Sequence, residues 1–312
     1  MSDRAHAGVP IIDVSRYDEA TIRAVGDALG EHGFVSIVGH GVDPALLDRA
    51  FEVAGDLFGL PPQVLARYER PDIQRQRGYV PFRSESAVGG LAPDLKAFWH
   101  VGRDLPADHP LVAKGLMHPN PWPTERPLFA PVMRAVFREL ERVALSMLDA
   151  LAAYLGADRA AFREMVRDGN SVLRIIDYPD VADVEPGAVR AAAHEDINLL
   201  TILPAATKPG LELLTRDGRW LPIASAPGAL ICDTGDMMQL VSGGRLPAVT
   251  HRVVNPEGAD GGRRSMPFFL HPRPDARLVM PGEAGRGDGV LAHDFLLDRL
   301  AANYGAARPG SR

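Results

Sequence analysis

The sequence is poor in cysteine and lysine, with the single cysteine Cys232 and three lysines among 34 basic residues. One cysteine cannot form an intramolecular disulfide, so we expect a reducing compartment and a cytoplasmic protein. No run of about 18 apolar residues occurs, and the N-terminus lacks an apolar stretch of signal-peptide length, so we expect no membrane association. The formal net charge of -6 provides no basic field, which argues against nucleic acid as a partner.

Several catalytic motifs are also missing. There is no G-x-x-x-x-G-K phosphate loop, and the Gly-x-Gly pairs at 39–41 and 285–287 are not completed as G-x-G-x-x-G. No G-x-S-x-G elbow is present. Cys232 lies in an apolar strand candidate, where a buried, inert thiol is the favoured interpretation. Nucleotide cradling and nucleophilic hydrolysis therefore lack their usual signatures.

What is present is the composition of a folded globular protein, with 46% hydrophobic and 24% charged residues over 312 positions. In the first half, hydrophobic periodicity predicts strands at 9–14 and 34–38 and helices at 18–30, 43–59 and from 61. Residues 71–125 are irregular, which indicates a long functional loop region. A long amphipathic helix is predicted between Pro127 and Gly156, with its apolar stripe facing the core.

From Ser171 onward the pattern changes to short β-rich segments separated by turns. Asp217-Gly218 indicates a hairpin, the glycine-rich stretches 89–90 and 282–289 indicate loops, and 291–304 is a terminal helix. This spacing is typical of a β-sandwich or barrel. The eight strand candidates are 172–176, 198–203, 211–214, 220–223, 229–232, 238–241, 250–254 and 265–270. We expect one integrated unit made of an N-terminal α/β region (1–125), a supporting helix (126–170), a catalytic core (171–275) and a C-terminal tail with a helix (276–312).

The residues that carry chemistry begin with His194-Glu195-Asp196. In extended backbone the side chains alternate, so His194 and Asp196 project to one face and Glu195 projects away. A second histidine, His251, lies in another strand candidate. Two imidazoles and one carboxylate on one face of an octahedron form the ligand set of nonheme Fe(II) oxygenases. Taken alone, the His194-x-Asp196 spacing could arise by chance, and a core or turn position is the favoured interpretation of His251 by itself.

A third element is Arg263-Arg264-Ser265. The same alternation places Arg263 and Ser265 on one face, where a guanidinium and a hydroxyl could hold a ligand carboxylate. Arg264 faces elsewhere. On its own, this triplet could also be the charged end of a hairpin.

With these pieces in order, the sequence resembles the isopenicillin N synthase-like family of Fe(II)- and 2-oxoglutarate-dependent oxygenases. The resemblance spans nearly the whole chain. Its main segments are 9–13, 31–42, 173–179, 194–203, 210–213, 217–220, 227–230, 235–239, 250–255 and 263–269.

The resemblance implies a mainly β fold with flanking helices, in which a double-stranded β-helix (a jelly-roll, cupin-like core) follows a helical N-terminal region and precedes a C-terminal helix. It implies that His194, Asp196 and His251 are the catalytic iron ligands, and that Arg263, Ser265 and Tyr178 bind 2-oxoglutarate. Where many members carry asparagine two residues before that tyrosine, this chain has Ile176, so one co-substrate contact differs. Because the metal-ligand aspartate is retained, a halogenase is not expected.

The implied activity is that of an Fe(II)- and 2-oxoglutarate-dependent dioxygenase, an oxidoreductase that consumes O2. It would hydroxylate an unactivated C–H of a small molecule and convert 2-oxoglutarate to succinate and CO2. The alternative within the family is a 2-oxoglutarate-independent iron oxidase of the isopenicillin N synthase or aminocyclopropane-carboxylate oxidase type. The alternative outside it is a jelly-roll binding module without redox chemistry.

The substrate is not readable from the sequence, nor is the oligomeric state. An amino acid or a natural-product intermediate is expected, the former because Arg83 would suit a carboxylate, although a solvated loop arginine is the commoner situation. The candidate pocket residues are Tyr79, Phe82, Arg83, Glu85, Phe98, Trp99, His100, Phe269 and Phe295.

Overall fold

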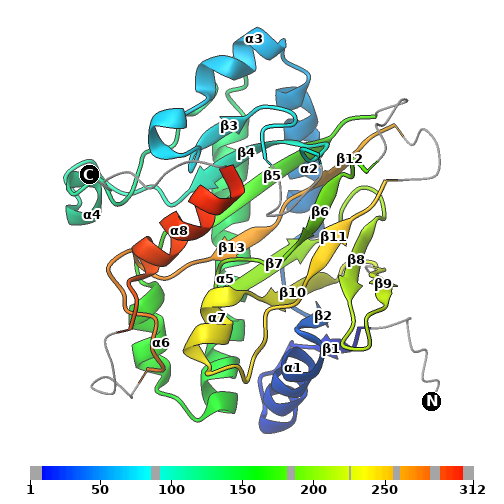
Figure 1. Ribbon diagram of the computed structural model, residues 1–312, viewed down its shortest axis with the longest axis vertical. Helices are drawn as coiled ribbons and strands as arrows, with labels where there is room; N and C mark the ends of the chain where they lie inside the picture. The colour runs from blue at the N-terminus through cyan, green and yellow to red at the C-terminus, as the bar shows by residue number, and fades with distance from the viewer. Residues whose placement is uncertain are drawn as a thin grey trace.

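The structure, a computed structural model, describes residues 9–85, 92–180, 187–224, 226–255, 261–281 and 289–304. These residues form two β-sheets that face one another (Figure 1). The large sheet contains, in spatial order, β1 (Ile11–Asp13), β2 (Phe34–Val38), β10 (Leu230–Thr234), β7 (Leu200–Pro204), β13 (Phe268–Leu270), β5 (Val172–Tyr178), β4 (Ala97–Gly102) and β3 (Gly78–Val80), and β12 (Arg263–Ser265) also pairs with β5. The small sheet contains β6 (Ala191–His194), β11 (His251–Val253), β8 (Leu211–Leu214) and β9 (Trp220–Pro222).

Helices cover the outer face of the large sheet. The long helix α5 contacts β7 and β13, and it also packs against α1, α2 and α6. The described helices are α1 (Glu19–His32), α2 (Pro44–Phe58), α3 (Pro62–Leu65), α4 (Pro110–Ala113), α5 (Phe129–Leu155), α6 (Arg159–Val166), α7 (Asp236–Val241) and α8 (Ala292–Tyr304), with 3-10 turns η1 (Ala66–Tyr68) and η2 (Pro71–Ile73).

Local sequence signals set the ends of these helices. The side chains of Asp18 and Asp43 accept hydrogen bonds from the first turns of α1 and α2. Gly33 ends α1 in the left-handed conformation with φ 67°. A side chain at this position would also collide with Val249, because a Cβ would lie 2.2 Å from its Cγ2. The predicted helices over 18–30, 43–59 and 127–156 are therefore confirmed.

Two apolar clusters follow from this layering. The larger lies between the helices and the large sheet and includes Leu173, Ile175 and Phe268. The smaller lies between the two sheets and includes Phe98, Ile176 and Tyr178. Alternation along β5 therefore sends successive side chains to the helix side and to the space between the sheets. Two facing, mostly antiparallel sheets with helices outside match the predicted double-stranded β-helix.

Three predictions of secondary structure need correction. The segment 238–241, predicted as a strand, belongs to helix α7, because a short apolar run does not distinguish a strand from a buried helical turn. The predicted strand 265–270 is interrupted at Met266-Pro267 and contributes to both β12 and β13. The region 71–125, predicted to be irregular, supplies β3 and β4. All six residues of β4 are buried, so no polar alternation marks this strand.

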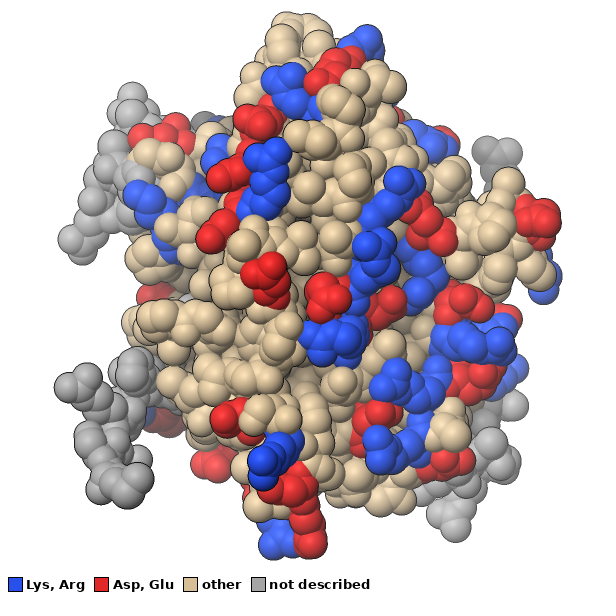
Figure 2. All heavy atoms as spheres, turned by 180° about the vertical axis from the view of Figure 1, so that it is seen from behind, with Lys and Arg blue, Asp and Glu red and all other residues tan. Residues whose placement is uncertain are grey.

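The outer surface carries mixed charge. On the face seen in Figure 2, basic and acidic side chains are interspersed, and no extended area of one sign is visible. Among the described residues, oppositely charged side chains form ion pairs, such as Arg163 with Asp149 at 2.7 Å and Arg142 with Glu139 at 3.1 Å. Such pairs between exposed groups contribute little to stability.

Candidate metal centre and substrate cavity

Two neighbouring strands of the small sheet bring the two histidines together. β6 and β11 are antiparallel, and His194 lies directly opposite His251 in their register. Asp196 follows β6 by two residues and is buried, whereas Glu195 between them is exposed. The predicted alternation therefore holds, and residues distant in sequence become neighbours.

The three side chains form a compact donor set. Asp196 Oδ1 lies 3.9 Å from His194 Nε2 and 3.8 Å from His251 Nε2. One ligand atom from each residue lies within 4.8 Å of the others. Among the residues that the structure describes, this is the group of side chains close enough together to hold one metal ion. Two nitrogen donors and one carboxylate oxygen suit a nonheme ferrous ion, so the residues present fit the expected metal.

Backbone carbonyls orient both imidazoles. Nδ1 of His194 lies 2.7 Å from the carbonyl oxygen of Ala192, and Nδ1 of His251 lies 3.1 Å from that of Val249. A carbonyl only accepts hydrogen bonds, so Nδ1 carries the proton in each ring. Nε2 then keeps its lone pair and faces Asp196, as a metal ligand must.

Electrostatics favour the protonation states that a metal requires. Burial, with a contribution from His251, lowers the pKa of His194 to about 4. Burial opposes ionisation of Asp196, but the two nearby imidazoles hold the pKa of this carboxyl below its ordinary value. Thr201 Oγ1 donates a hydrogen bond to Asp196 Oδ2, which leaves Oδ1 facing the imidazoles.

The residues expected to hold 2-oxoglutarate also come together. In the antiparallel register of β12 and β5, Arg263 lies opposite Tyr178 and Ser265 lies opposite Ile176. Arg263, Ser265 and Tyr178 are all buried. The guanidinium carbon of Arg263 lies 5.0 Å from the centre of the Tyr178 ring, and its Nε donates to the carbonyl oxygen of Lys208 at 3.0 Å.

Arg264 confirms the alternation along β12. Its Nε donates to Asp177 Oδ1 at 2.8 Å, and Asp177 is its neighbour in the β5 register. Both side chains therefore project away from Arg263 and Tyr178. A buried guanidinium beside a hydroxyl and a phenol suits a dicarboxylate, so this donor set fits 2-oxoglutarate.

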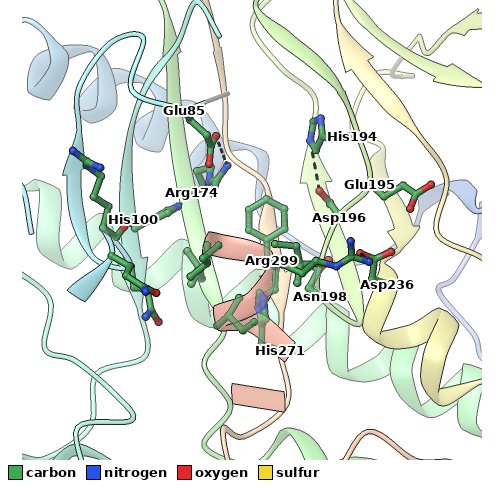
Figure 3. A pocket seen from close by; sticks show the side chains of 18 of the residues that line it. Glu85, His100, Arg174, His194, Glu195, Asp196, Asn198, Asp236, His271 and Arg299 are labelled. Atoms are coloured by element: carbon green, nitrogen blue, oxygen red, sulfur yellow. Dashed lines mark hydrogen bonds and ion pairs between the residues drawn. The ribbon is translucent and has the colours of Figure 1, made fainter. Parts of the chain in front are cut away.

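A cavity of about 330 Å³ opens beside the metal site. Figure 3 shows His194 and Asp196 on one side of it and Glu85, His100 and Arg174 on the other. Arg263, Ser265 and Tyr178 do not line it. The remaining lining residues are Gln74, Arg75, Gln76, Asp94, Lys96, Asn170, Val172, Ala193, Glu195, Ile197, Asn198, Asp236, Thr250, Phe269, His271, Leu296, Arg299 and Leu300.

A buried ionic cluster forms part of this wall. Lys96 Nζ lies 2.7 Å from Glu85 Oε2 and 2.8 Å from Asp94 Oδ2. Burial disfavours the ammonium, but the two carboxylates raise the pKa of Lys96 above its ordinary value. Arg174 lies 3.4 Å from the same oxygen of Glu85 and donates from Nε to His100 Nε2 at 2.7 Å. The cluster is therefore ionised and internally paired.

Three of the nine pocket candidates from the sequence line the cavity: Glu85, His100 and Phe269. Phe98 lies between the sheets beneath Arg174, and the guanidinium carbon of Arg174 is 4.4 Å from the centre of the Phe98 ring. Trp99 needs correction, because alternation along β4 turns it to the helix side, where it packs on Phe129.

The other candidates also lie outside the lining. Tyr79 is buried in the core on the same side as Trp99, Phe295 of α8 is partly buried against the core, and Phe82 is exposed. The side chain of Arg83 does not line the cavity either, although its backbone nitrogen bonds to the Lys96 carbonyl at 3.3 Å. The substrate region is therefore built mainly by other residues.

Five further residues that line the cavity were not predicted from the sequence: Lys96, Arg174, Gln74, Gln76 and His271. Alternation could have found two of them. Lys96 lies two residues before Phe98, and Arg174 lies two residues before Ile176, which faces the inner cluster. The other three lie outside the predicted strands and carried no local signal.

Comparisons with known proteins agree with this geometry. A family model described as the 2OG-Fe(II) oxygenase superfamily matches residues 169–272, and one described as non-haem dioxygenase in morphine synthesis N-terminal matches residues 9–125. Gibberellin 20 oxidase 2 of Oryza sativa subsp. indica is 32% identical over 289 residues, covering 89% of this chain and 70% of the relative.

Two solved structures are similar along their whole lengths. A 2OG-Fe(II) oxygenase family protein from Caulobacter crescentus has a TM-score of 0.84 and 35% identity, covering 94% of this chain and 99% of the other. A full-length Neurospora crassa protein crystallised with alpha-KG and thymine has a TM-score of 0.82 and 25% identity, covering 96% and 98%.

The chain belongs to the 2OG-Fe(II) oxygenase superfamily. It is an Fe(II)- and 2-oxoglutarate-dependent dioxygenase, an oxidoreductase that uses O2 and acts on a small molecule. In the part of the chain that the structure describes, no helix is both long and apolar enough to span a bilayer.

Proposed function

We propose that His194, Asp196 and His251 hold the ferrous ion, that Arg263, Ser265 and Tyr178 hold 2-oxoglutarate, and that the enzyme hydroxylates a C–H bond of its substrate. The observation that carries this proposal is the β6–β11 register, which sets His194 opposite His251 within 4 Å of the Asp196 carboxylate. With iron bound at this site, O2 would supply the oxidising equivalents: one oxygen atom would enter the substrate, and the other would enter succinate as 2-oxoglutarate loses CO2.

The chain's own residues bind and orient. The Ala192 and Val249 carbonyls fix the two imidazoles, and Thr201 fixes Asp196, so three ligand atoms face one point before a metal arrives. The cavity places the substrate beside His194 and Asp196.

The substrate proposal begins from the sequence expectation of an amino acid or a natural-product intermediate. Arg83, the residue that suggested a carboxylate, does not line the cavity, so support for an amino acid is reduced.

We also propose a cytoplasmic location, on the argument that the single cysteine Cys232 is a buried free thiol. Pairing of β2 with β10 supports the proposal that the N-terminal region and the core act as one unit.

The test is succinate formation from 2-oxoglutarate with Fe(II), O2 and no added substrate, since oxygenases of this type turn over slowly without one. We expect His194→Ala and Asp196→Ala to abolish it while His32→Ala, on the surface of α1, leaves it unchanged. Full activity in either of the first two variants would contradict the ligand assignment. Iron-dependent substrate oxidation that leaves 2-oxoglutarate unconsumed would identify the oxidase alternative instead.

A further inference from the structure

We propose that the cavity binds an uncharged cyclic amide or imide, whose polar edge lies against Gln74 and Gln76 while its oxidisable C–H lies toward His194 and Asp196. This inference rests on the proposed function and specifies its substrate class. It follows from the charges, the amide groups and the apolar surfaces of the cavity wall.

The charged side chains of the wall are already balanced by one another. Lys96 and Arg174 are compensated by Glu85 and Asp94, as described above. Arg299 lies 2.7 Å from Asp236.

Apart from the metal ligand Asp196, two other charged residues line the cavity. Arg75 Nη2 lies 2.8 Å from Glu69, which is outside the cavity, and Glu195 is exposed. Burying a charged ligand without an opposite charge is costly. A wall whose charges are satisfied internally therefore favours an uncharged ligand.

The chain adopts a strained turn to place its amides in this wall. Gln74 and Arg75 have φ of 52° and 57°, in the left-handed region that residues other than glycine seldom occupy. The His100 imidazole holds the turn, because its Nδ1 lies 2.8 Å from the Arg75 carbonyl oxygen. Strain of this kind is concentrated at active sites and ligand sites. The turn directs 74–76 into the cavity on the side of His100, across from His194.

Hydrogen bonds from Arg77 through Asn170 fix the orientation of the Gln76 amide. Arg77, which is fully buried, donates from Nη2 to Asn170 Oδ1 at 2.6 Å. Asn170 must then use its amide nitrogen toward Gln76, and Nδ2 donates to Gln76 Oε1 at 3.1 Å. Gln76 consequently presents its NH2 group as a donor to the cavity. A ligand carbonyl is the natural partner for this group.

The side-chain oxygen of Gln74 has no hydrogen-bond donor among the residues that the structure describes, and this atom is buried. Leaving a buried polar atom without a hydrogen bond is costly, so a ligand that supplies one is favoured. If the amide is turned over, its NH2 replaces the oxygen and requires an acceptor instead. A cyclic amide carries an N–H and a C=O side by side and satisfies either orientation.

The remaining surfaces suit a flat ring. Phe269 supplies an aromatic ring, and Leu296 and Leu300 of α8 add aliphatic contacts. His271 also lines the cavity, and burial lowers its pKa to about 4, so it contributes no positive charge at neutral pH. A volume of about 330 Å³ is at the small end of ligand cavities. One or two fused rings therefore match the space better than an extended molecule.

The experiment uses the full chain with Fe(II), 2-oxoglutarate and O2, and measures succinate and oxygenated product. Thymine, 6-methyl-2-pyridone and 1-methylhydantoin are the uncharged probes. Orotate, 6-methylnicotinate, L-proline and L-leucine are the charged ones. We expect at least one uncharged probe to accelerate succinate formation and gain one oxygen atom, and the charged probes to do neither. Faster turnover of a carboxylate or an amino acid, or no response to any uncharged ring, would overturn the substrate class.

A variant pair tests the amide wall itself. Gln74→Leu should raise the KM for the uncharged probe about tenfold, the loss of one buried hydrogen bond, while the KM for 2-oxoglutarate stays the same. Gln63→Leu on exposed α3 is the matched control and should change neither value. Equal KM values for the probe in both variants would contradict the role of Gln74.

Failure of the underlying function would look different from failure of this inference. If the chain did not use iron and 2-oxoglutarate, the anaerobic mixture of protein, Fe(II) and 2-oxoglutarate would show no visible charge-transfer band, and no succinate would form with any probe. If only the substrate class were wrong, the band and slow succinate formation would be present without acceleration by the uncharged rings.

Discussion

Asp94 and His194 are linked through the backbone of a single residue, Ala192. Asp94 Oδ1 accepts a hydrogen bond from the Ala192 nitrogen at 3.0 Å, and the Ala192 carbonyl accepts one from His194 Nδ1 at 2.7 Å. Lys96 holds the other oxygen of Asp94 at 2.8 Å. A buried ion pair in the cavity wall thus fixes the strand that carries a metal ligand.

This linkage predicts a loss of metal affinity in Asp94→Ala. Groups that orient metal ligands typically contribute about 10- to 100-fold to affinity, and we expect a loss in that range for Fe(II), measured by anaerobic titration. Asp94→Asn keeps an oxygen that can accept from Ala192, so its loss should be smaller. Thermal unfolding separates the effect from global destabilisation, since the removal of one partner from a buried pair costs about 3–5 kcal/mol. Wild-type affinity in a folded Asp94→Ala protein would contradict the linkage.

The two arginines of β12 provide an internally controlled test of the co-substrate site. Arg263→Ala should raise the 2-oxoglutarate concentration needed for half-maximal succinate formation by at least about thirtyfold, because loss of a buried partner for a carboxylate costs about 2–5 kcal/mol. Arg264→Ala removes an equal charge from the opposite face, where it pairs with Asp177, and should leave that concentration unchanged. Similar effects of the two substitutions would show that the site responds to overall charge and not to Arg263.

Alternation of side chains made the metal and co-substrate residues predictable from the sequence. One residue separates His194 from Asp196, and one separates Arg263 from Ser265. Side chains two positions apart project to the same face wherever a strand or its extension is straight. The sequence could not specify the pairing of β6 with β11, which sets His194 opposite His251. The resemblance to a family supplied the ligand set His194, Asp196 and His251, and the register itself is a finding of the structure.

The substrate wall was not predictable for physical reasons. Gln74 and Arg75 adopt the left-handed backbone conformation. A glycine in the sequence would suggest this conformation, but a glutamine or an arginine does not. The ligand-facing side of β4 could not be recognised because both of its faces are buried. Trp99 and its neighbour His100 were therefore both candidates, although only His100 reaches the cavity.

The C-terminal helix α8, whose Leu296 and Leu300 line the cavity, carries an ion pair to α7, and this predicts a local effect. Arg299 lies 2.7 Å from Asp236 on α7, but half of the Arg299 side chain is exposed, so the pair contributes at most about 1 kcal/mol. Arg299→Gln should therefore accelerate amide hydrogen exchange in α8 by up to about fivefold without changing exchange in α5.

Arg23→Gln is the control for this effect, because it removes a surface pair with Glu19 on α1, away from the cavity. Exchange in α8 should be unchanged in that variant. If α8 exchanged at the wild-type rate in Arg299→Gln as well, the ion pair would have no role in holding the helix.

His271 predicts a pH dependence of stability. Burial lowers its pKa to about 4 from the ordinary value of 6.5, and its Nδ1 lies 3.2 Å from the Phe269 carbonyl oxygen. Between these two pKa values the unfolded chain binds a proton that the folded protein does not, so stability falls as the pH falls from about 6.5 to about 4. The free energy of unfolding should drop by about 2 kcal/mol more in the wild type than in His271→Gln between about pH 7.5 and about pH 5.

The comparison with the variant isolates His271, because other titrating groups contribute equally to both proteins. His32→Gln, which replaces a partly exposed histidine of α1, should follow the wild-type curve. Denaturant titrations at several pH values measure the difference directly. A constant gap between wild type and His271→Gln across this range would mean that the buried imidazole takes up its proton in the folded state, and the neutral cavity wall inferred above would then carry a positive charge in acid.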